Sequence, residues 1–155
     1  MAKISPIQPC LWFADRAREA MEYYVDVFPD SRINSVEEYP DASLDEHFGG
    51  MSGKVLNGQF TLNGMDFVCL DGGPRFKFNE SISFVVACDG QEELDRYWSK
   101  LSHVPESEQC GWCKDQFGVS WQIIPANMRE LTRRPEQIQV MMGQKKIVIA
   151  ELENA

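Results

Sequence analysis

The spacing of apolar residues changes several times along the chain and predicts two successive sets of elements. In the first half, apolar positions alternate with polar ones, then recur every three or four residues, and then alternate again. This pattern predicts a strand, an amphipathic helix and three further strands. The expected ranges are residues 4–13, 15–28, 31–39, 54–62 and 65–70. Asn63-Gly64, between the last two ranges, is a strong hairpin signal.

Residues 40–53 interrupt this pattern between the second and third strands. They combine Pro40, Gly49-Gly50 and Gly53 with an acidic stretch and few apolar side chains. Turn-forming residues at this density predict a mobile loop.

The second half repeats the order of elements. We expect a strand over residues 81–88, a helix that is capped by Asp89 or Gly90 and runs through Leu101, and a hairpin of residues 108–114 and 118–125. Residues 126–155 are predicted to form a mainly helical extension. Because half of a 155-residue chain buries little core, the two modules, about 4–73 and 81–125, are expected to pack as a single domain over residues 1–155.

Composition excludes several classes of partner. Lys and Arg total 15 against 24 Asp and Glu, which gives a formal charge of −9. This balance argues against binding to nucleic acid or to an anionic membrane surface. No apolar stretch approaches the ~18 residues of a membrane span, and the first residues do not resemble a secretory signal. Five cysteines, an odd number, are predicted to be reduced thiols, so we expect a cytoplasmic protein.

Three segments carry a resemblance to a known family. They are residues 72–84 (GGPRFKFNESISF), 109–112 (QCGW) and 114–122 (KDQFGVSWQ). The chain resembles the PhnB-like family of the glyoxalase/bleomycin-resistance (vicinal oxygen chelate) superfamily, which often carries the description 3-demethylubiquinone-9 3-methyltransferase-like. The resemblance implies an α+β fold of paired βαβββ modules, whose curled mixed sheets form a cavity, and it implies a homodimer.

The methyltransferase description predicts a site for a methyl donor. A nucleotide-type donor is usually held by a glycine-rich turn between a strand and a helix. Here Gly72-Gly73-Pro74 leads into Arg75-Phe76 rather than into a helical pattern. We therefore interpret the description as inherited within the family.

Metal-dependent members of the superfamily hold a divalent ion with four side chains. The resemblance places these positions at Gln8, at Ser81, at Gln122 and at either Val68 or Cys69. None of these residues is Asp, Glu or His, and amides, hydroxyls and at most one thiol bind a divalent transition metal poorly. The sequence therefore predicts no metal and no other cofactor.

Other residues with reactive side chains have a simpler interpretation. Cys110 and Cys113 form a Cys-x-x-Cys unit, but it precedes a hairpin turn instead of opening a helix, so two unreactive thiols are favoured and a redox role stays open. Asp66, Asp71 and Glu80 lie nearest the expected cavity and could act as general bases if buried.

These observations favour a metal-free protein that binds a small, partly apolar ligand. Strand alternation and the resemblance together predict the ligand-binding residues, which are Gln8, Trp12, Cys69, Ser81, Ser83, Ser120 and Gln122. An enzyme acting on a small substrate in the same cavity (a lyase, a dioxygenase or the labelled methyltransferase) is the alternative. A third interpretation is that aromatic side chains fill the cavity themselves.

Overall fold

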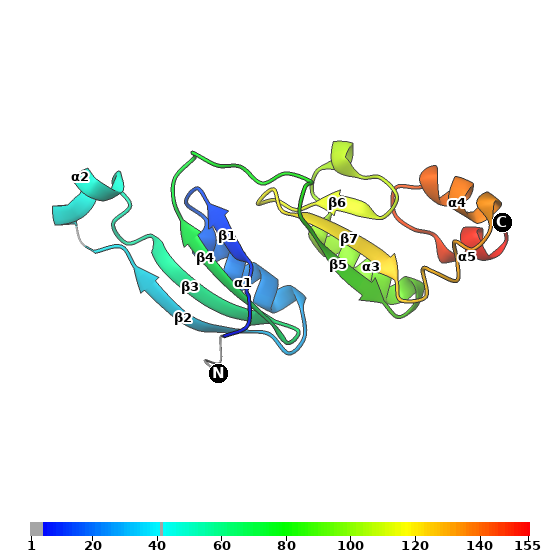
Figure 1. Ribbon diagram of the computed structural model, residues 1–155, viewed down its shortest axis with the longest axis horizontal. Coiled ribbons are helices and arrows are strands. Elements are labelled where there is room, and N and C mark those ends of the chain that lie inside the picture. Colours follow the sequence, from blue (N-terminus) through cyan, green and yellow to red (C-terminus); the bar gives the residue numbers. More distant parts are fainter. Residues whose placement is uncertain (1–4, 41) are drawn as a thin grey trace. The chain divides into compact units, whose positions relative to one another are not determined.

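The computed structural model describes residues 5–40 and 42–155, and the chain divides into two compact units, Met1–Lys77 and Phe78–Ala155 (Figure 1). The elements of the first unit are β1 (Cys10–Phe13), α1 (Ala17–Val27), β2 (Arg32–Glu38), η1 (Ala42–Leu44), α2 (Asp45–Phe48), β3 (Val55–Leu62) and β4 (Met65–Asp71). Its four strands form one sheet in the order β1-β4-β3-β2. β1 runs parallel to β4, and the other neighbours are antiparallel.

Helix α1 covers one face of this sheet, and the core of the unit lies between them. Met21 and Tyr24 of α1 are fully buried. The Tyr24 ring is stacked with Phe60 of β3 at 6.5 Å between centroids, and Phe60 is stacked with Phe67 of β4 at 5.2 Å. The side chains that alternate with these point to the opposite face. No helix among the described residues of this unit covers it, and we call it the open face of the first sheet.

The second unit contains β5 (Ser83–Cys88), α3 (Gly90–Leu101), η2 (Pro105–Ser107), β6 (Trp112–Lys114), β7 (Ser120–Pro125), α4 (Pro135–Met142) and α5 (Ile149–Glu153). Its sheet has the order β5-β7-β6, with β5 parallel to β7 and β6 antiparallel to it. Helix α3 packs on one face of the sheet (Figure 1). Leu94 and Leu101 of α3 and Ile123 of β7 are fully buried there.

The C-terminal extension packs on the second unit, through α3 and the turn before β6. Ile147 and Leu152 are fully buried. Gln91 of α3 donates from Nε2 to the Ile147 carbonyl at 3.0 Å and accepts from the Ile149 amide at 2.8 Å. The Cys110 amide also donates to the Gln144 carbonyl at 2.8 Å.

The predicted α+β class and the mixed sheets are confirmed, but the second unit has one strand fewer than the βαβββ order implies. Between α3 and β6 the chain forms the Pro105–Ser107 turn and contributes only the isolated bridge Gln109↔Trp112. The packing of both units into a single domain stays a prediction.

Two predicted strands begin later than their apolar patterns suggested. The strand predicted over residues 4–13 starts at Cys10, because Pro6 and Pro9 have no N–H to donate to a ladder, and residue 4 lies outside the described part of the chain. The strand predicted from residue 81 starts at Ser83. The segment predicted as a loop contains the two short helices η1 and α2.

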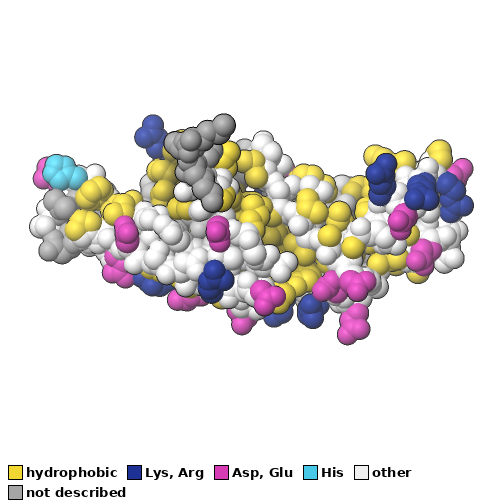
Figure 2. All heavy atoms as spheres, turned by 60° about the horizontal axis from the view of Figure 1, so that its bottom comes forward, with side chains coloured by type: hydrophobic (Ala, Val, Ile, Leu, Met, Phe, Trp, Pro, Cys, Tyr) yellow, Lys and Arg dark blue, Asp and Glu magenta, His cyan; other side chains and the backbone are white. Residues whose placement is uncertain are grey.

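Charged side chains of both signs lie on the surface of the protein. On the face drawn in Figure 2, acidic and basic side chains are interspersed with apolar ones. Among the described residues, no helix combines the length and the apolar character needed to cross a bilayer.

Candidate functional site

Two rows of residues cross the open face of the second sheet, the face opposite α3. The strand register places Ser120 beside Ser83 on one side and Lys114 on the other. In the next row, Gln122 lies between Val85 of β5 and Trp112 of β6. Side chains two residues apart in a strand share a face, so both rows belong to the open face.

The intervening residues face the other way. Trp121 and Ile123 are buried at 3% and 0% exposure, on the side that α3 covers. The predicted ligand-binding residues Ser120 and Gln122 therefore share one face of β7.

Two of the predicted residues bond to each other. Gln122 Nε2 donates to Ser83 Oγ at 2.9 Å. Ser81 does not belong to this arrangement, because it lies in a turn before β5, where its amide donates to Asn79 Oδ1 at 2.9 Å and the residue is exposed.

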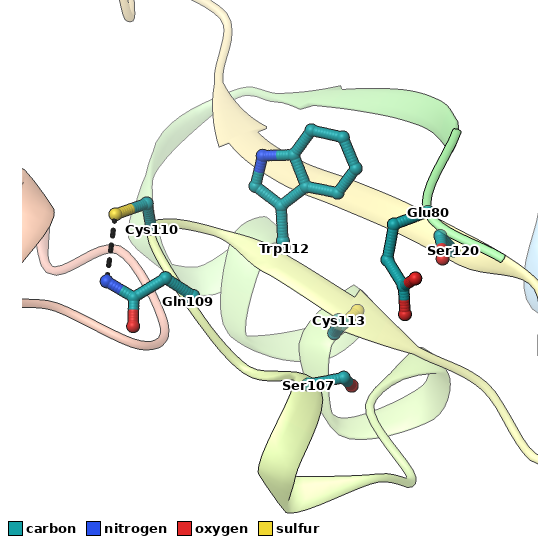
Figure 3. Close-up of a pocket in the computed structure, with 7 residues that line it drawn as sticks. All are labelled: Glu80, Ser107, Gln109, Cys110, Trp112, Cys113 and Ser120. Atoms are coloured by element: carbon teal, nitrogen blue, oxygen red, sulfur yellow. Dashed lines mark hydrogen bonds between the residues drawn. The ribbon is translucent and has the colours of Figure 1, made fainter. Parts of the chain in front are cut away.

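A pocket of about 430 Å³ lies beside these rows (Figure 3). Its walls come from the start of the unit, from η2, from the turn before β6, and from β6 and β7. The lining residues are Glu80, Ser107, Gln109, Cys110, Trp112, Cys113 and Ser120. This volume is within the usual range for a small-molecule site.

Ser120 is the exceptional residue of the pocket. It is 2% exposed, and its Oγ has no hydrogen-bond partner among the described residues. A buried hydroxyl left unpaired costs about 1–3 kcal/mol, which a bound molecule with a polar atom at this point would recover.

An ion pair borders the same pocket. Lys114 Nζ donates to the Glu80 carboxylate in a short hydrogen bond, and this bond holds the pKa of Glu80 below its ordinary value. The Lys114 side chain is 21% exposed and that of Glu80 is 59% exposed. Neither Lys114 nor Trp112 is among the predicted ligand-binding residues. Strand alternation is the signal that could have found them, because the two residues share the face of β6 that lies beside Gln122.

The two cysteines of the Cys-x-x-Cys unit have different surroundings. Cys113 lies within β6, and burial raises the pKa of its thiol to about 12, so it stays protonated at neutral pH. Cys110 precedes the strand in a turn with φ +50°, and Gln109 Nε2 contacts its Sγ at 3.2 Å. Figure 3 shows the two thiols apart in the pocket wall, and both are free.

Trp12 lies on the open face of the first sheet, as alternation predicts. Leu11 and Phe13 on either side of it are buried, whereas Trp12 is half-buried. Its Nε1 donates to the Gly73 carbonyl at 3.0 Å, and its ring meets Phe76 edge-on at 4.9 Å between centroids. Trp12 thus holds the segment that follows β4. Gln8 lies exposed two residues before β1, and ligand contact by either residue stays a prediction.

Cys69 lies on the side of the sheet that α1 covers, so of the two residues left open for this position it is Val68 that lies on the open face, and ligand contact by Cys69 is not supported by its orientation. A Cβ placed on Gly58 would lie 2.7 Å from Cys69 Sγ and 2.8 Å from Met21 Sδ, so the thiol lies on the same side of the sheet as α1. Cys69 is completely buried, and its pKa is raised to about 12 by burial. Val68 is half-buried and pairs with Cys10 in the register of β1 and β4.

The carboxylates of the first unit have structural partners. Asp71 is 1% exposed, and its two oxygens accept from the Ala17 amide at 2.8 Å and the Val55 amide at 2.9 Å. It therefore takes the place of an N-cap for α1. Asp66 accepts from Thr61 Oγ1 at 2.6 Å.

The residues at the metal positions do not fit a divalent ion in either unit. The first unit offers an amide from Gln8 and the hydrocarbon side chain of Val68, and the second offers an amide from Gln122, which is already paired, and a hydroxyl from Ser81. Strong protein ligands for zinc are imidazole, thiolate and carboxylate. Over residues 5–40 and 42–155, no group of three or more His, Cys, Asp or Glu could hold a metal ion.

A family model with the description 3-demethylubiquinone-9 3-methyltransferase matches residues 5–124. The chain belongs to this family. It is similar to the PhnB protein from Bacillus cereus, with 34% identity over 78% of this chain and 98% of that chain and a TM-score of 0.63. The predicted resemblance to PhnB-like proteins is thereby confirmed.

Two further solved structures share the fold of this PhnB-like chain at lower identity. A Pseudomonas aeruginosa protein is 16% identical over 79% of this chain and 97% of its own, with a TM-score of 0.56. An Arabidopsis thaliana gene product is 18% identical over 79% of this chain and 99% of its own, with a TM-score of 0.50. No curated protein matches the chain.

Proposed function

We propose that this PhnB-like chain is a small-molecule-binding protein whose ligand occupies the pocket of the second unit without a metal ion. The observation that carries the proposal is the unpaired, 2% exposed hydroxyl of Ser120 in the pocket wall. A ligand atom that donates to or accepts from Ser120 Oγ would satisfy it, and the Trp112 ring offers an apolar surface beside it (Figure 3).

Binding is favoured over methyl transfer by the local backbone. The Gly72-Gly73 pair follows β4 and leads into a turn at Pro74-Arg75 rather than into a helix, and β5 is joined to α3 through Asp89 with the single glycine Gly90. Neither connection is the glycine-rich strand-to-helix turn that usually holds a nucleotide-type cofactor. S-adenosylmethionine is accordingly expected to produce no binding signal at the pocket.

The test is a titration of the isotope-labelled full chain with 2-naphthamide, a neutral planar probe, followed by amide NMR shifts. The expected shifts concentrate on Trp112–Lys114 and on Ser120–Gln122. The Ser120→Ala variant should bind about threefold to tenfold more weakly, which is the range for one lost neutral hydrogen bond.

The matched control is Ser99→Ala, because Ser99 is an exposed α3 residue whose hydroxyl bonds the Arg96 carbonyl. It should bind the probe as the unsubstituted chain does. No shifts at millimolar 2-naphthamide, or shifts confined to the first unit, would overturn the proposal.

A further inference from the structure

The charge distribution beside the pocket points to the class of the ligand. Lys114 and Ser120 are direct partners on adjacent antiparallel strands and share the open face. Side chains in this relationship have Cβ atoms about 4.5–5.5 Å apart. Lys114 and Ser120 are therefore neighbouring residues on this face, and Glu80, which accepts from the Lys114 ammonium, lines the pocket together with Ser120. An ammonium and a hydroxyl can both donate hydrogen bonds to an acceptor bound there.

The partner of Lys114 in the free protein is itself a carboxylate. Glu80 lines the pocket and pairs with Lys114 from a segment that lies before β5 and outside the sheet. The Glu80 side chain is 59% exposed, so its carboxylate is already partly hydrated and loses little when it leaves Lys114 for water. The Lys114 side chain is only 21% exposed, so its ammonium needs an anionic partner, and a competing anion can replace the exposed Glu80 carboxylate.

The remaining wall suits an apolar body. Trp112 presents its ring, and the Cys113 thiol is protonated because burial raises its pKa to about 12. The amide nitrogen of Gln109 is already engaged, donating to the Met142 carbonyl at 2.7 Å. One lysine balances one negative charge, which favours a carboxylate over a doubly charged phosphate.

We propose that the pocket selects a small aromatic carboxylate, that Lys114 is its counter-ion, and that Glu80 occupies the position of the ligand carboxylate in the free protein. This inference rests on the proposed function and adds the charge of the ligand and a competing residue. Glu80 would then set specificity, because any ligand must displace it to reach Lys114.

The test compares 2-naphthoate with its neutral analogue 2-naphthamide by calorimetry on the full chain. Lys114→Met should weaken 2-naphthoate about tenfold or more and leave 2-naphthamide nearly unchanged, since it removes a charge-assisted bond. Glu80→Gln should tighten 2-naphthoate about threefold by removing the competitor, again with little effect on 2-naphthamide.

A second ion pair in the same unit provides matched controls. Lys146 Nζ and Asp95 Oδ1 lie 2.8 Å apart, and neither residue lines the pocket. Lys146→Met and Asp95→Asn change the net charge as the test variants do, and both should leave the preference for 2-naphthoate intact.

The outcomes separate this inference from the proposed function. If both probes bind equally and Glu80→Gln does not change their ratio, the carboxylate selectivity is wrong while the pocket still binds. If Asp95→Asn tightens 2-naphthoate as much as Glu80→Gln, a general charge effect explains the result and the role of Glu80 is overturned. If neither probe binds, both proposals fail.

Discussion

Gln122 Nε2 donates a 2.9 Å hydrogen bond to Ser83 Oγ and so joins β7 to β5 across the open face of the second sheet. The pair satisfies two polar groups that alternation alone would leave available to a ligand. Ser120, two residues before Gln122, is buried without such a partner. The difference between these neighbouring residues is what distinguishes the pocket from the rest of the face.

This difference predicts opposite effects on stability. Ser120→Ala removes an unpaired buried hydroxyl and should raise the free energy of unfolding by about 1 kcal/mol, whereas Ser83→Ala leaves the Gln122 amide without its acceptor and should lower it by a similar amount. Urea unfolding of both variants measures the two changes. Destabilisation by Ser120→Ala would mean that its hydroxyl has a partner in the folded protein.

A second prediction concerns the packing of Trp12 on the segment after β4. A Cβ at Gly72 would lie 2.2 Å from Trp12 Cζ2, so Gly72→Ala forces the indole to move and should destabilise the chain by about 1–3 kcal/mol. The smaller aliphatic side chain in Trp12→Leu should remove most of the additional cost of Gly72→Ala. Thermal unfolding of the single and double variants gives the coupling, and strictly additive effects would contradict this contact.

The sequence predicts much of this fold for identifiable reasons. Period changes located both main helices, and Asn63-Gly64 forms its turn with φ +45° and +85°. Alternation placed Ser120 and Gln122 on one face of β7, because side-chain direction in a strand depends only on parity.

The misses come from contacts that no local pattern encodes. The choice between Val68 and Cys69 stayed open, since the end of a strand does not reveal which side chains face α1 without its partner strand. Asp71 bonds the first turn of α1, although it lies 54 residues after Ala17 in the sequence. Only the folded strand β4 brings it there, so the sequence near α1 does not reveal this contact. The ion pair of Lys114 with Glu80 spans 34 residues and likewise needs the assembled sheet.

The buried thiols predict a loss of stability at alkaline pH. Burial raises the pKa of Cys69 and of Cys113 from 9.0 to about 12. The contribution of these thiols is complete below pH 9 and declines as pH rises towards 12, because the unfolded chain then binds fewer protons than the folded one. Urea unfolding between pH 8 and pH 10 should show this decline, and a smaller one in Cys69→Ala. Equal slopes in both proteins would contradict it.

We also predict that the chain forms a homodimer. Ile82, just before the edge strand β5, is 72% exposed, and Val85, within this strand, is 56% exposed. A strand edge with exposed apolar residues is suited to burial by a second copy. Light scattering after gel filtration should give twice 17.7 kDa at micromolar concentration. Val85→Lys should shift the mass towards the monomer, and a mass of 17.7 kDa for the unsubstituted chain would refute the prediction.

A crystal structure of the full chain grown with 2-naphthamide tests most directly whether a small molecule binds in the pocket at Ser120. We expect the naphthalene ring to lie beside Trp112 and a polar atom of the probe to lie about 2.8 Å from Ser120 Oγ. A structure in which Ser120 Oγ bonds a protein group, with the pocket filled by side chains and the probe bound elsewhere, would contradict the account.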